Sequence, residues 1–563
     1  MPWTLYRYIL KELFKMLIPA ALVLLVVFSF ATAIKPLNEG ILGPWALILF
    51  IYYTIPTMLM LVLPFAGVYA ITLAFCRAVS DNEITACLSS GMSYRTILLP
   101  VLFVGLLLTL TLFYMSNWVV PSFYRKVAVV LQQDVAQILV SQIQNGHAVK
   151  LRSGVILHAE AAKAVERPQL PGHEIQPNQG ILVRGVVVGE FAPDGLLRRE
   201  ASAEAADIYF FRDGGQAWVE MRLEDGMAYD QHSGVLWRSS GVIETNRIFL
   251  SSRFRDNMKF STWPELSRIG RDPDADDGVG NRKNVLVRLM SAQKALSELA
   301  TALTDPSSGP AVLERPQAEI YHISAPRVVH DGETLKLSGD GRDQVQLHIV
   351  VGGVAHSDVR AEHVTISVDR QTTRALINFD PAYSVSEPWL SLECKHAVIT
   401  DLSGRGEQVE QTKFTRRGRL PLPVAERFID MKVRDLLALV ESDPKYNEVP
   451  EIRRAAAKTV RTLSKLKREI IAQLNLRGAS AIAAVLFLMF GALLSLRMGK
   501  SLPLVVYFWT FLAAMIVVVM THGGENLITD QNYGIAVGLL ITWLGDVLLA
   551  GAVAVLYWRV SLH

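Results

Sequence analysis

Six apolar runs stand out along this chain of 563 residues, each close to or longer than the roughly 20 residues that an α-helix needs to cross a bilayer. They form two groups of three, at residues 13–34, 45–75, 96–120, 478–496, 502–520 and 533–558. Pro56 and Pro64 lie inside the second run, where each removes a backbone hydrogen bond, so we expect that helix to be tilted or kinked. The first run lacks a small-residue cleavage pattern behind it, and we expect it to be retained. The pattern predicts an α-helical membrane protein with six transmembrane helices.

Between the two groups, the hydrophobic pattern is mostly that of strands. Alternation is clear at 218–223, and β-rich runs broken by Gly, Asp and Pro cover 155–161, 180–191, 200–211, 217–229 and 242–251. A second β-rich stretch covers 318–400. Helices are predicted at 285–303, 433–441 and 450–475, with polar links at 271–284 and 305–316. Many short strands in series predict an antiparallel sandwich, a jelly-roll or an open barrel.

These elements divide the chain into four parts. Residues 1–120 hold the first three spans, with a short connecting helix near 80–91. Residues 121–425 form a large β-rich domain, which includes an extra segment near 270–420. Residues 426–475 are helices that lead back to the membrane, and residues 476–563 hold the last three spans.

Basic residues in the short loops predict the orientation of the chain. They flank one side of the spans, at Arg7, Lys11, Lys15, Arg77, Arg95, Arg497, Lys500 and Arg559. The short loop on the opposite side, at 521–532, contains no Lys or Arg. The positive-inside rule then places both termini in the cytoplasm and the β-rich region outside. Eight basic residues at 453–477 argue the other way, but large domains are translocated largely regardless of charge, so the short loops count for more.

The composition fits membrane spans combined with a sizeable aqueous domain, because 51% of residues are apolar and 19% are charged. A net charge of only +3 gives no argument for a nucleic-acid partner. Cys76, Cys87 and Cys394 are too far apart in sequence to indicate a paired metal or redox motif. Residues 499–501, Gly-Lys-Ser, resemble the end of a phosphate-binding loop, but the first glycine of that motif is replaced by Leu494. We therefore predict no catalytic residues, no metal and no bound cofactor, and any ATP must be hydrolysed by a partner.

The turn between the second and third spans carries the most specific signal. Ser80 or Asp81 is the predicted N-cap of a short helix, Glu83 lies in its first turn, and Gly91 ends it. Ile84, Cys87 and Leu88 follow at i, i+3 and i+4 and form one apolar stripe. Such a helix is suited to docking on a second protein and passing its motion into the spans. The alternative is a connecting helix that lies on the lipid surface.

Together these features resemble the LptF/LptG permease family, the membrane subunits of the lipopolysaccharide-exporting ABC transporter. The resemblance rests on motifs in a fixed order around the six spans: Arg7-Tyr8, Asp81-Asn82-Glu83-Ile84 with Ser90-Gly91-Met92-Ser93, Trp118-Val119-Val120-Pro121, Arg468-Glu469 with Leu474 and Arg477, and Trp543. The sequence of the turn at 81–93 is more similar to LptF than to LptG.

The resemblance implies a fold and a task. Six spans flank a periplasmic jellyroll-like domain in the bacterial inner membrane, and two such permeases pair around a cavity. An LptB-like ATPase dimer drives them, and lipopolysaccharide or a related anionic glycolipid passes to LptC-like and LptA-like jellyroll proteins. Glu83 matches the family's coupling glutamate, so Glu83, Ile84, Cys87 and Leu88 are the predicted ATPase contacts. Two rival functions are a membrane-anchored periplasmic scaffold and a mechanotransmission protein that moves the outer domain without lipid transport.

The chain also departs from the family. The family's lysine in the first span would fall at Thr32, and the nearest cation here is Lys35. With Arg125 and Lys126, these residues are the predicted contacts for an anionic substrate, against the alternative that the cations only anchor at the interface. Gly545 and Asp546 replace the family's proline and asparagine in the last span, and a charge there should face protein or water rather than lipid. The β-rich region is also much larger than one jellyroll.

Overall fold

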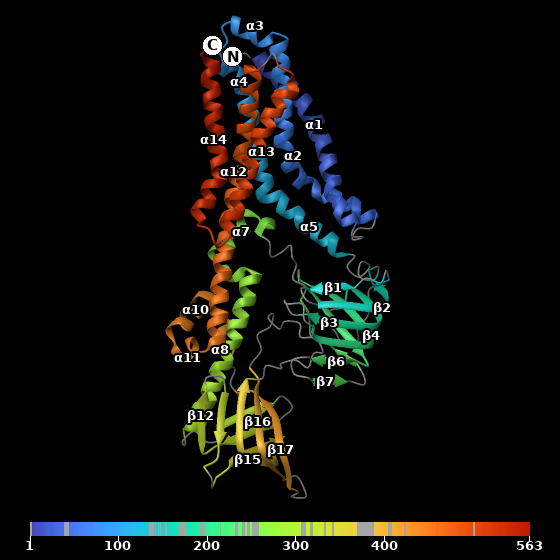
Figure 1. Cartoon of the computed structure of the whole chain (residues 1–563), viewed down its shortest axis with the longest axis vertical. Coiled ribbons are helices and arrows are strands. Elements are labelled where there is room, and N and C mark those ends of the chain that lie inside the picture. The colour runs from blue at the N-terminus through green and yellow to red at the C-terminus, as the bar shows by residue number, and fades with distance from the viewer. Residues whose placement is uncertain are drawn as a thin grey trace.

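The computed structural model describes residues 3–562, apart from a set of gaps. The gaps are 39–43, 134–139, 141, 145, 147, 153–154, 167, 169, 171–175, 192–196, 214–215, 231–234, 239–241, 245–247, 250–257, 306–310, 316–318, 332–333, 341–342, 369–387, 403–407, 422–423 and 499–500. A helical bundle holds both termini at one end, and two separate β-sheets lie beyond its other end (Figure 1). We call these the terminal end and the insert end of the bundle.

The bundle confirms the six predicted spans. Its helices are α1 (Trp3–Asn38), α2 (Pro44–Ser80), α4 (Tyr94–Tyr114), α12 (Pro450–Arg497), α13 (Pro503–Thr529) and α14 (Ile535–Ser561). A π-helical turn, η1 (Met115–Val119), joins α4 to α5 (Val120–Gln133), which leaves the bundle at an angle. Among the described residues, six helical segments are long and apolar enough to cross a membrane. The short helix α3 (Glu83–Ser89) connects α2 to α4 at the terminal end.

Two kinds of packing hold the spans together. Buried aliphatic side chains of α1, α2, α4 and α12 form one core, which includes Leu13, Ile71, Ile97 and Leu488. Between α13 and α14, the backbones themselves approach at Gly524, where an added Cβ would lie only 2.6 Å from a backbone nitrogen of the neighbouring helix. Small residues permit such close approach, which is a common way for membrane helices to associate in lipid.

Helix α12 is much longer than a membrane span. Its 48 residues extend for about 72 Å at ~1.5 Å per residue. The sequence predicted a helix at 450–475 and a separate span at 478–496, and the structure joins them without a break. No proline interrupts this stretch after Pro450, and its one glycine at the join, Gly478, packs beside the Trp543 ring. The outer half of α12 therefore continues the membrane span as a stalk.

The stalk is completed by helices that pack on the outer half of α12. They are α7 (Trp263–Arg271), α8 (Asp277–Thr304), α9 (Glu426–Ile429), α10 (Val433–Ser442) and α11 (Pro444–Asn447). Leu286 and Met290 of α8 pack with Leu436 of α10 and Ile452 of α12 in one buried core. The polar link predicted at 271–284 is wrong in part, because α8 begins at Asp277, where the Asp276 carboxylate accepts a hydrogen bond from the Val279 N–H at 3.0 Å.

The first β-sheet lies between α5 and the stalk in sequence. Its strands are β1 (Val149–Arg152), β2 (Val155–Glu166), β3 (Gln179–Phe191), β4 (Leu197–Asp213), β5 (Gln216–Glu224), β6 (Met227–Asp230), β7 (Val235–Arg238), β8 (Val242–Glu244) and β9 (Ile248–Phe249). The first five follow chain order and are antiparallel. The long strand β4 pairs with β5 along 205–213 and with β6 along 199–202. The predicted β-rich domain is confirmed as a curled antiparallel sheet.

The second β-sheet lies at the far end of the stalk (Figure 1). Its strands are β10 (Ala311–Arg315), β11 (Glu319–Ser324), β12 (Arg327–Asp331), β13 (Thr334–Ser338), β14 (Val345–Val351), β15 (Val354–Val368), β16 (Leu390–Asp401) and β17 (Gln408–Gly418). An isolated antiparallel bridge joins Arg419, the residue after β17, to Glu314 of β10. The last strand of the sheet therefore returns beside the first, and the sheet curls toward closure. Leu296 and Leu299 of α8 are buried in its core. The extra segment is thus a separate β-domain, fixed to the stalk by α8.

The attachment of α8 gives the first prediction. Leu296 is fully buried between α8 and the second sheet. Leu296→Ala should lower the stability of this domain by about 2–5 kcal/mol, the cost of removing a buried leucine and leaving a cavity. Thermal unfolding and limited proteolysis of the detergent-solubilised chain would measure the loss. Thr301→Ala, on an exposed turn of the same helix, is the matched control and should change little. Equal behaviour of the two variants would show that α8 does not fix the domain.

Candidate functional site

Helix α3 lies at the terminal end of the bundle, beside both chain termini (Figure 1). Its N-cap is Asn82, which adopts a left-handed conformation with φ 56°, and not Ser80 or Asp81 as predicted. Asn tolerates this conformation better than most residues, which explains the shift of the helix start. Gly91, with φ 85°, follows the end of the helix as predicted.

The apolar stripe of α3 points into the bundle. Ile84 is buried in the same core as Leu13 and Ile97, and Cys87 and Leu88 pack against that core while partly exposed. The stripe therefore anchors α3 to the spans, and the outward face carries Thr85, Ala86 and Ser89. Ile84 is buried and Cys87 and Leu88 are partly exposed, so their predicted contacts with an ATPase stay a prediction, and the three residues join α3 to the core that α1, α2 and α4 share.

Glu83 is held by a side chain from the first helix. The Tyr8 hydroxyl donates to its carboxylate, at 2.9 Å to Oε1 and 3.1 Å to Oε2. Nearby, Arg77 of α2 pairs with Glu12 of α1 at 3.1 Å and with Asp81 at 3.5 Å. These polar contacts connect α1, α2 and α3 at the terminal end. Glu83 stays partly exposed, so its predicted contact with an ATPase stays a prediction.

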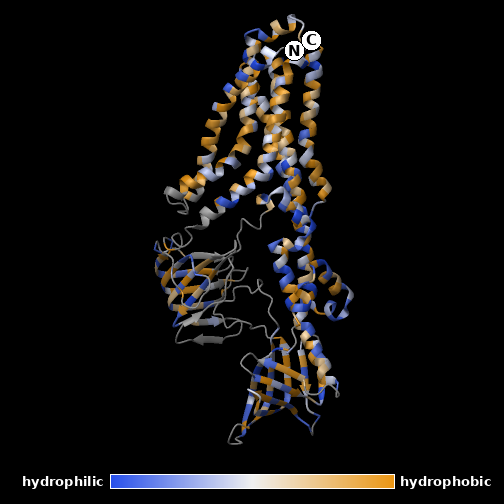
Figure 2. Cartoon of the chain, turned by 180° about the vertical axis from the view of Figure 1, so that it is seen from behind, coloured by the Kyte–Doolittle hydropathy of each residue, from blue (hydrophilic) through white to orange (hydrophobic). Residues whose placement is uncertain are grey.

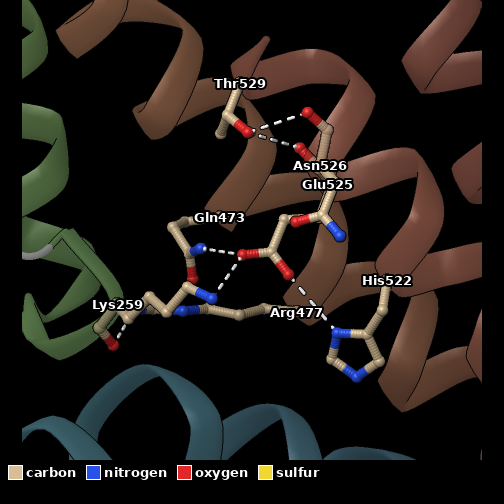
Figure 3. Close-up of polar contacts among 7 residues, drawn as sticks. All are labelled: Lys259, Gln473, Arg477, His522, Glu525, Asn526 and Thr529. Carbon is tan, nitrogen blue, oxygen red and sulfur yellow. Dashed lines mark hydrogen bonds and ion pairs between the residues drawn. The ribbon is translucent and has the colours of Figure 1, made fainter.

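A second polar cluster lies at the insert end, around Glu525 of α13 (Figure 3). The Glu525 side chain is buried, with 4% of its residue surface exposed. Its Oε1 accepts from the Gln473 amide of α12 at 2.9 Å and pairs with Lys259 Nζ at 2.9 Å. Its Oε2 lies 3.3 Å from His522 Nδ1. We call these four residues the Glu525 cluster.

Arg477 of α12 also contacts the segment that contains Lys259. Its guanidinium donates to the backbone carbonyls of Lys259 at 3.1 Å and Ser261 at 2.8 Å, and to the Asn117 side chain at 3.4 Å. Asn117 is fully buried in the π-helical turn η1, a type of turn that is frequent at functional sites. The chain returning from the first sheet, at η2 (Met258–Phe260), is therefore fixed to two spans, α12 and α13.

Sequence analysis missed the partners in this cluster. The fifth span was predicted to end at 520, which placed Glu525 in a loop, whereas α13 continues to Thr529. A carboxylate within a helix that crosses an apolar layer is expensive unless it is paired, and this rule could have marked Glu525. Nothing in the pattern around Lys259 identified it as the partner, because the two residues are 266 positions apart.

The predicted substrate cations have partners within the chain. Arg125 of α5 pairs with Glu265 of α7 at 2.9 Å, and Lys126 lies over the rings of Phe123 and Tyr53, at 5.1 and 5.8 Å from their centres. Burial alone would raise the pKa of Glu265, but hydrogen bonds from Thr262 and the Arg125 charge lower it overall. Arg125 and Lys126 are both exposed despite these contacts.

The two remaining candidates lie near the end of α1. The Thr32 hydroxyl donates to the Ser29 carbonyl at 2.8 Å, a contact within its own helix. Lys35 belongs to α1, and its side chain lies outside the described residues. Ala33 of α1, Phe50 of α2 and Val127 of α5 share a small buried cluster, which places the end of α1 beside α5. The predicted role of the four candidates toward an anionic substrate stays a prediction.

An apolar cavity lies beside the Glu525 cluster. It is lined by residues of α2, α4, α12 and α13, among them Met60, Pro64, Leu112, Phe487 and Val517, with His522 at its edge. Its volume is about 100 Å³.

Asp546 lies inside the bundle, as the sequence predicted, with 3% of its surface exposed. Neither of its carboxylate oxygens has a hydrogen-bond partner among the described residues. Near it on α14, the Trp543 indole N–H donates to the Asn475 side chain at 3.1 Å. Arg468 of α12 donates to the carbonyls of Ile528, Asp530 and Tyr533, and so fixes the loop between α13 and α14.

Residues 7–236 match the family described as Lipopolysaccharide export system permease LptF/LptG. The matched part contains the first three spans, α3 and the first sheet as far as β7, and it ends before the stalk and the second sheet. No curated protein matches the chain. The match covers less than half of the chain and does not distinguish LptF from LptG.

The Glu525 cluster gives the second prediction. Lys259→Ala leaves the buried carboxylate without its cation and should lower stability by about 1–3 kcal/mol. Glu525→Gln should cost less, because Lys259 has 52% of its side chain exposed and can be solvated by water. The double variant should be more stable than the sum of the two single losses predicts. Thermal unfolding of all four proteins closes this cycle, and strictly additive losses would contradict a direct pair.

Proposed function

We propose that this chain, which the match over residues 7–236 supports as an LptF/LptG permease, extracts lipopolysaccharide or a related anionic glycolipid from the bacterial inner membrane. The family match carries the proposal. The six spans and the curled sheet after the third span support it, because the match covers this arrangement up to β7. The lipid then passes to LptC-like and LptA-like jellyroll proteins through the first sheet.

The energy for extraction comes from an LptB-like ATPase dimer in this proposal. Lifting an acyl chain out of the bilayer costs about 0.8 kcal/mol for each CH₂ that is exposed. The ATPase binds α3, and Glu83 with the outward face of the helix is its contact. The packing of Ile84, Cys87 and Leu88 on the spans supports this role, because a push on α3 reaches three membrane helices without an intervening flexible link.

A second LptF/LptG-type permease completes the transporter. Two exposed apolar faces support this pairing, one on α1 at Leu22, Val26 and Phe30, and one on α13 at Phe508, Leu512 and Ile516. The spacing of four residues puts each set on one side of its helix. The sequence of the turn at 81–93 favours an LptF-like subunit. Lys35, Thr32, Arg125 and Lys126 are the proposed contacts for the anionic part of the lipid.

The termini lie in the cytoplasm in this proposal, and both sheets lie in the periplasm. The basic residues at 453–477 had argued for the opposite orientation. Two of them that lie close to the spans, Arg468 and Arg477, donate to backbone carbonyls of the chain itself. The others lie on the stalk of a large inserted domain, and such domains are translocated largely regardless of their charge.

One observation favours the rival function of mechanotransmission. Helix α12 runs without a break from the terminal end of the bundle to the stalk that carries the second sheet. Movement of this span would therefore move the second sheet whether or not lipid crosses the bundle. A periplasmic scaffold, in contrast, needs no ATPase.

Purification of the chain together with its bound partners tests these functions. Recovery of an ATPase and of an anionic glycolipid, identified by mass spectrometry, is expected for an export permease. An ATPase without lipid would favour mechanotransmission, and neither would favour a scaffold. Absence of bound glycolipid from a purified complex that hydrolyses ATP would overturn the proposed function.

The contact between Tyr8 and Glu83 allows a sharp test of coupling. Glu83→Ala should leave insertion intact and separate ATP hydrolysis from lipid release in a reconstituted complex. Tyr8→Phe removes the hydrogen bond but keeps the carboxylate, so it should retain most transport. If Glu83 only anchors α1 to α3, the two variants will lose transport equally, and the coupling role is then wrong.

Introduced cysteines test the orientation. Native Cys394 is unsuitable, because it is 1% exposed and burial raises its pKa to about 12, which leaves almost no reactive thiolate near neutral pH. Lys395→Cys, on an exposed position of β16, should react with a membrane-impermeant thiol reagent in cells with a permeabilised outer membrane. Ser89→Cys on α3 should react only after the inner membrane is opened. The reverse pattern would invert the topology.

A further inference from the structure

The outer half of α12 carries a stripe of positive charge on the side turned away from the other stalk helices. Residues 450–477 contain eight basic and two acidic residues, so their net charge is +6. Arg454, Lys458, Arg461 and Lys465 recur at i, i+4, i+7 and i+11, which places them on one face of the helix. We call these four residues the basic stripe. Figure 2 shows this half of α12 as largely hydrophilic, in contrast to the half inside the bundle.

The packing of α12 leaves the basic stripe exposed. The opposite face is buried through Ile452, Ala456, Thr459, Leu466 and Ile470. All four residues of the stripe are exposed. Lys465 pairs with Glu469 at 3.6 Å, and the other three form no ion pair with any residue that the structure describes. The stripe is thus a largely uncompensated row of cations.

Such a row of like charges destabilises the helix that carries it. Like charges three or four residues apart on a helix repel one another, whereas an ordinary exposed face mixes both signs. The stripe contains three successive spacings of this kind. A solvent-exposed face of a stalk does not require one sign of charge, so the stripe is better explained by an anionic ligand that lies along it.

The direction of the stripe decides the kind of ligand. Arg468 fixes the loop between α13 and α14, and this loop extends along α12 as far as Arg461, whose carbonyl accepts a hydrogen bond from the Gln531 amide at 3.3 Å. Arg461 therefore marks the end of the bundle, and Arg454 lies about 10.5 Å farther out at ~1.5 Å per residue. Charges of a flat bilayer surface level with this end act over about 8 Å at physiological ionic strength, so they do not reach Arg454. An elongated anion that stands away from the membrane reaches all four.

We propose that the basic stripe binds the anionic saccharide part of the glycolipid, aligned along the stalk while the acyl chains occupy the bundle. This inference rests on the proposed function, since the glycolipid joins a lipid to a polysaccharide that projects from the membrane. Val460 is the one large apolar side chain exposed among described residues 452–468, so the face suits a hydrophilic chain and not an apolar helix. The stalk lies outside residues 7–236, so the stripe adds a binding element beyond the matched part of the chain.

Binding of a soluble probe to the full chain in nanodiscs tests this proposal. The probe is the phosphorylated core saccharide released from lipopolysaccharide, and neutral dextran of similar size is the blank. The triple variant Arg454→Glu, Lys458→Glu and Arg461→Glu should bind the core saccharide at least about tenfold more weakly, and wild-type binding should weaken as salt is raised. The control variant, Arg327→Glu, Lys395→Glu and Arg434→Glu, changes the net charge equally at exposed positions of the insert and should bind like the wild type.

Each other outcome rejects the proposal. Equal binding by the stripe and control variants would show that the stripe is not the site. Loss of binding to phosphatidylglycerol vesicles, with saccharide binding unchanged, would assign the stripe to the bilayer surface. A photo-crosslinker at the exposed Ala457 that captures an acidic protein and no saccharide would assign it to a protein partner. Lipid recovered with each purified variant reports separately on the proposed function, because the acyl chains are held in the bundle and not on the stalk.

Discussion

At the insert end of the bundle, the architecture depends on the pairing of two buried charged side chains, because a buried charge is costly unless it has partners within the protein. Arg477 and Glu525 both find partners in the chain that returns from the first sheet. The guanidinium of Arg477 donates to the carbonyls of residues 259 and 261, and the carboxylate of Glu525 pairs with the Lys259 ammonium. Without these contacts, Glu525 would keep only Gln473 and His522 as partners among the described residues, and Arg477 would keep only Asn117.

The two β-sheets are attached to the spans in different ways, and only the first depends on the contacts of Arg477 and Glu525. The first sheet lies between α5 and η2 in sequence, and both of these flanking elements contact the bundle, α5 through Lys126 over the Tyr53 ring of α2 and η2 through Lys259 with Glu525. The second sheet is carried by α8, which packs along the outer half of α12, the same helix as the fourth span. A shift of α12 therefore reaches the second sheet through its packing with α8, whereas the first sheet responds through the polar contacts of the junction.

The terminal end shows how a short helix can be coupled to the spans. Helix α3 has only seven residues, too few to be stable by itself, and its apolar side chains share a core with α1, α2 and α4, in which Ile84 is buried and Cys87 and Leu88 are partly exposed. Its polar contacts run through Tyr8, Glu83, Arg77 and Glu12. A movement of α3 would thus act on the core that these three spans share.

The sequence by itself determined the six spans, the β-rich insert and the position of α3, because each depends on local hydrophobic periodicity and on residues that begin or end a helix. Apolar runs near 20 residues and alternating strands such as 218–223 are visible without any tertiary contact. Only the tertiary structure decided that 450–497 is one helix, that the stripe of Ile84, Cys87 and Leu88 faces inward, and that Lys259 pairs with Glu525. These features depend on contacts between residues far apart in the chain, and helical periodicity shows that a face is apolar or charged without showing what that face meets.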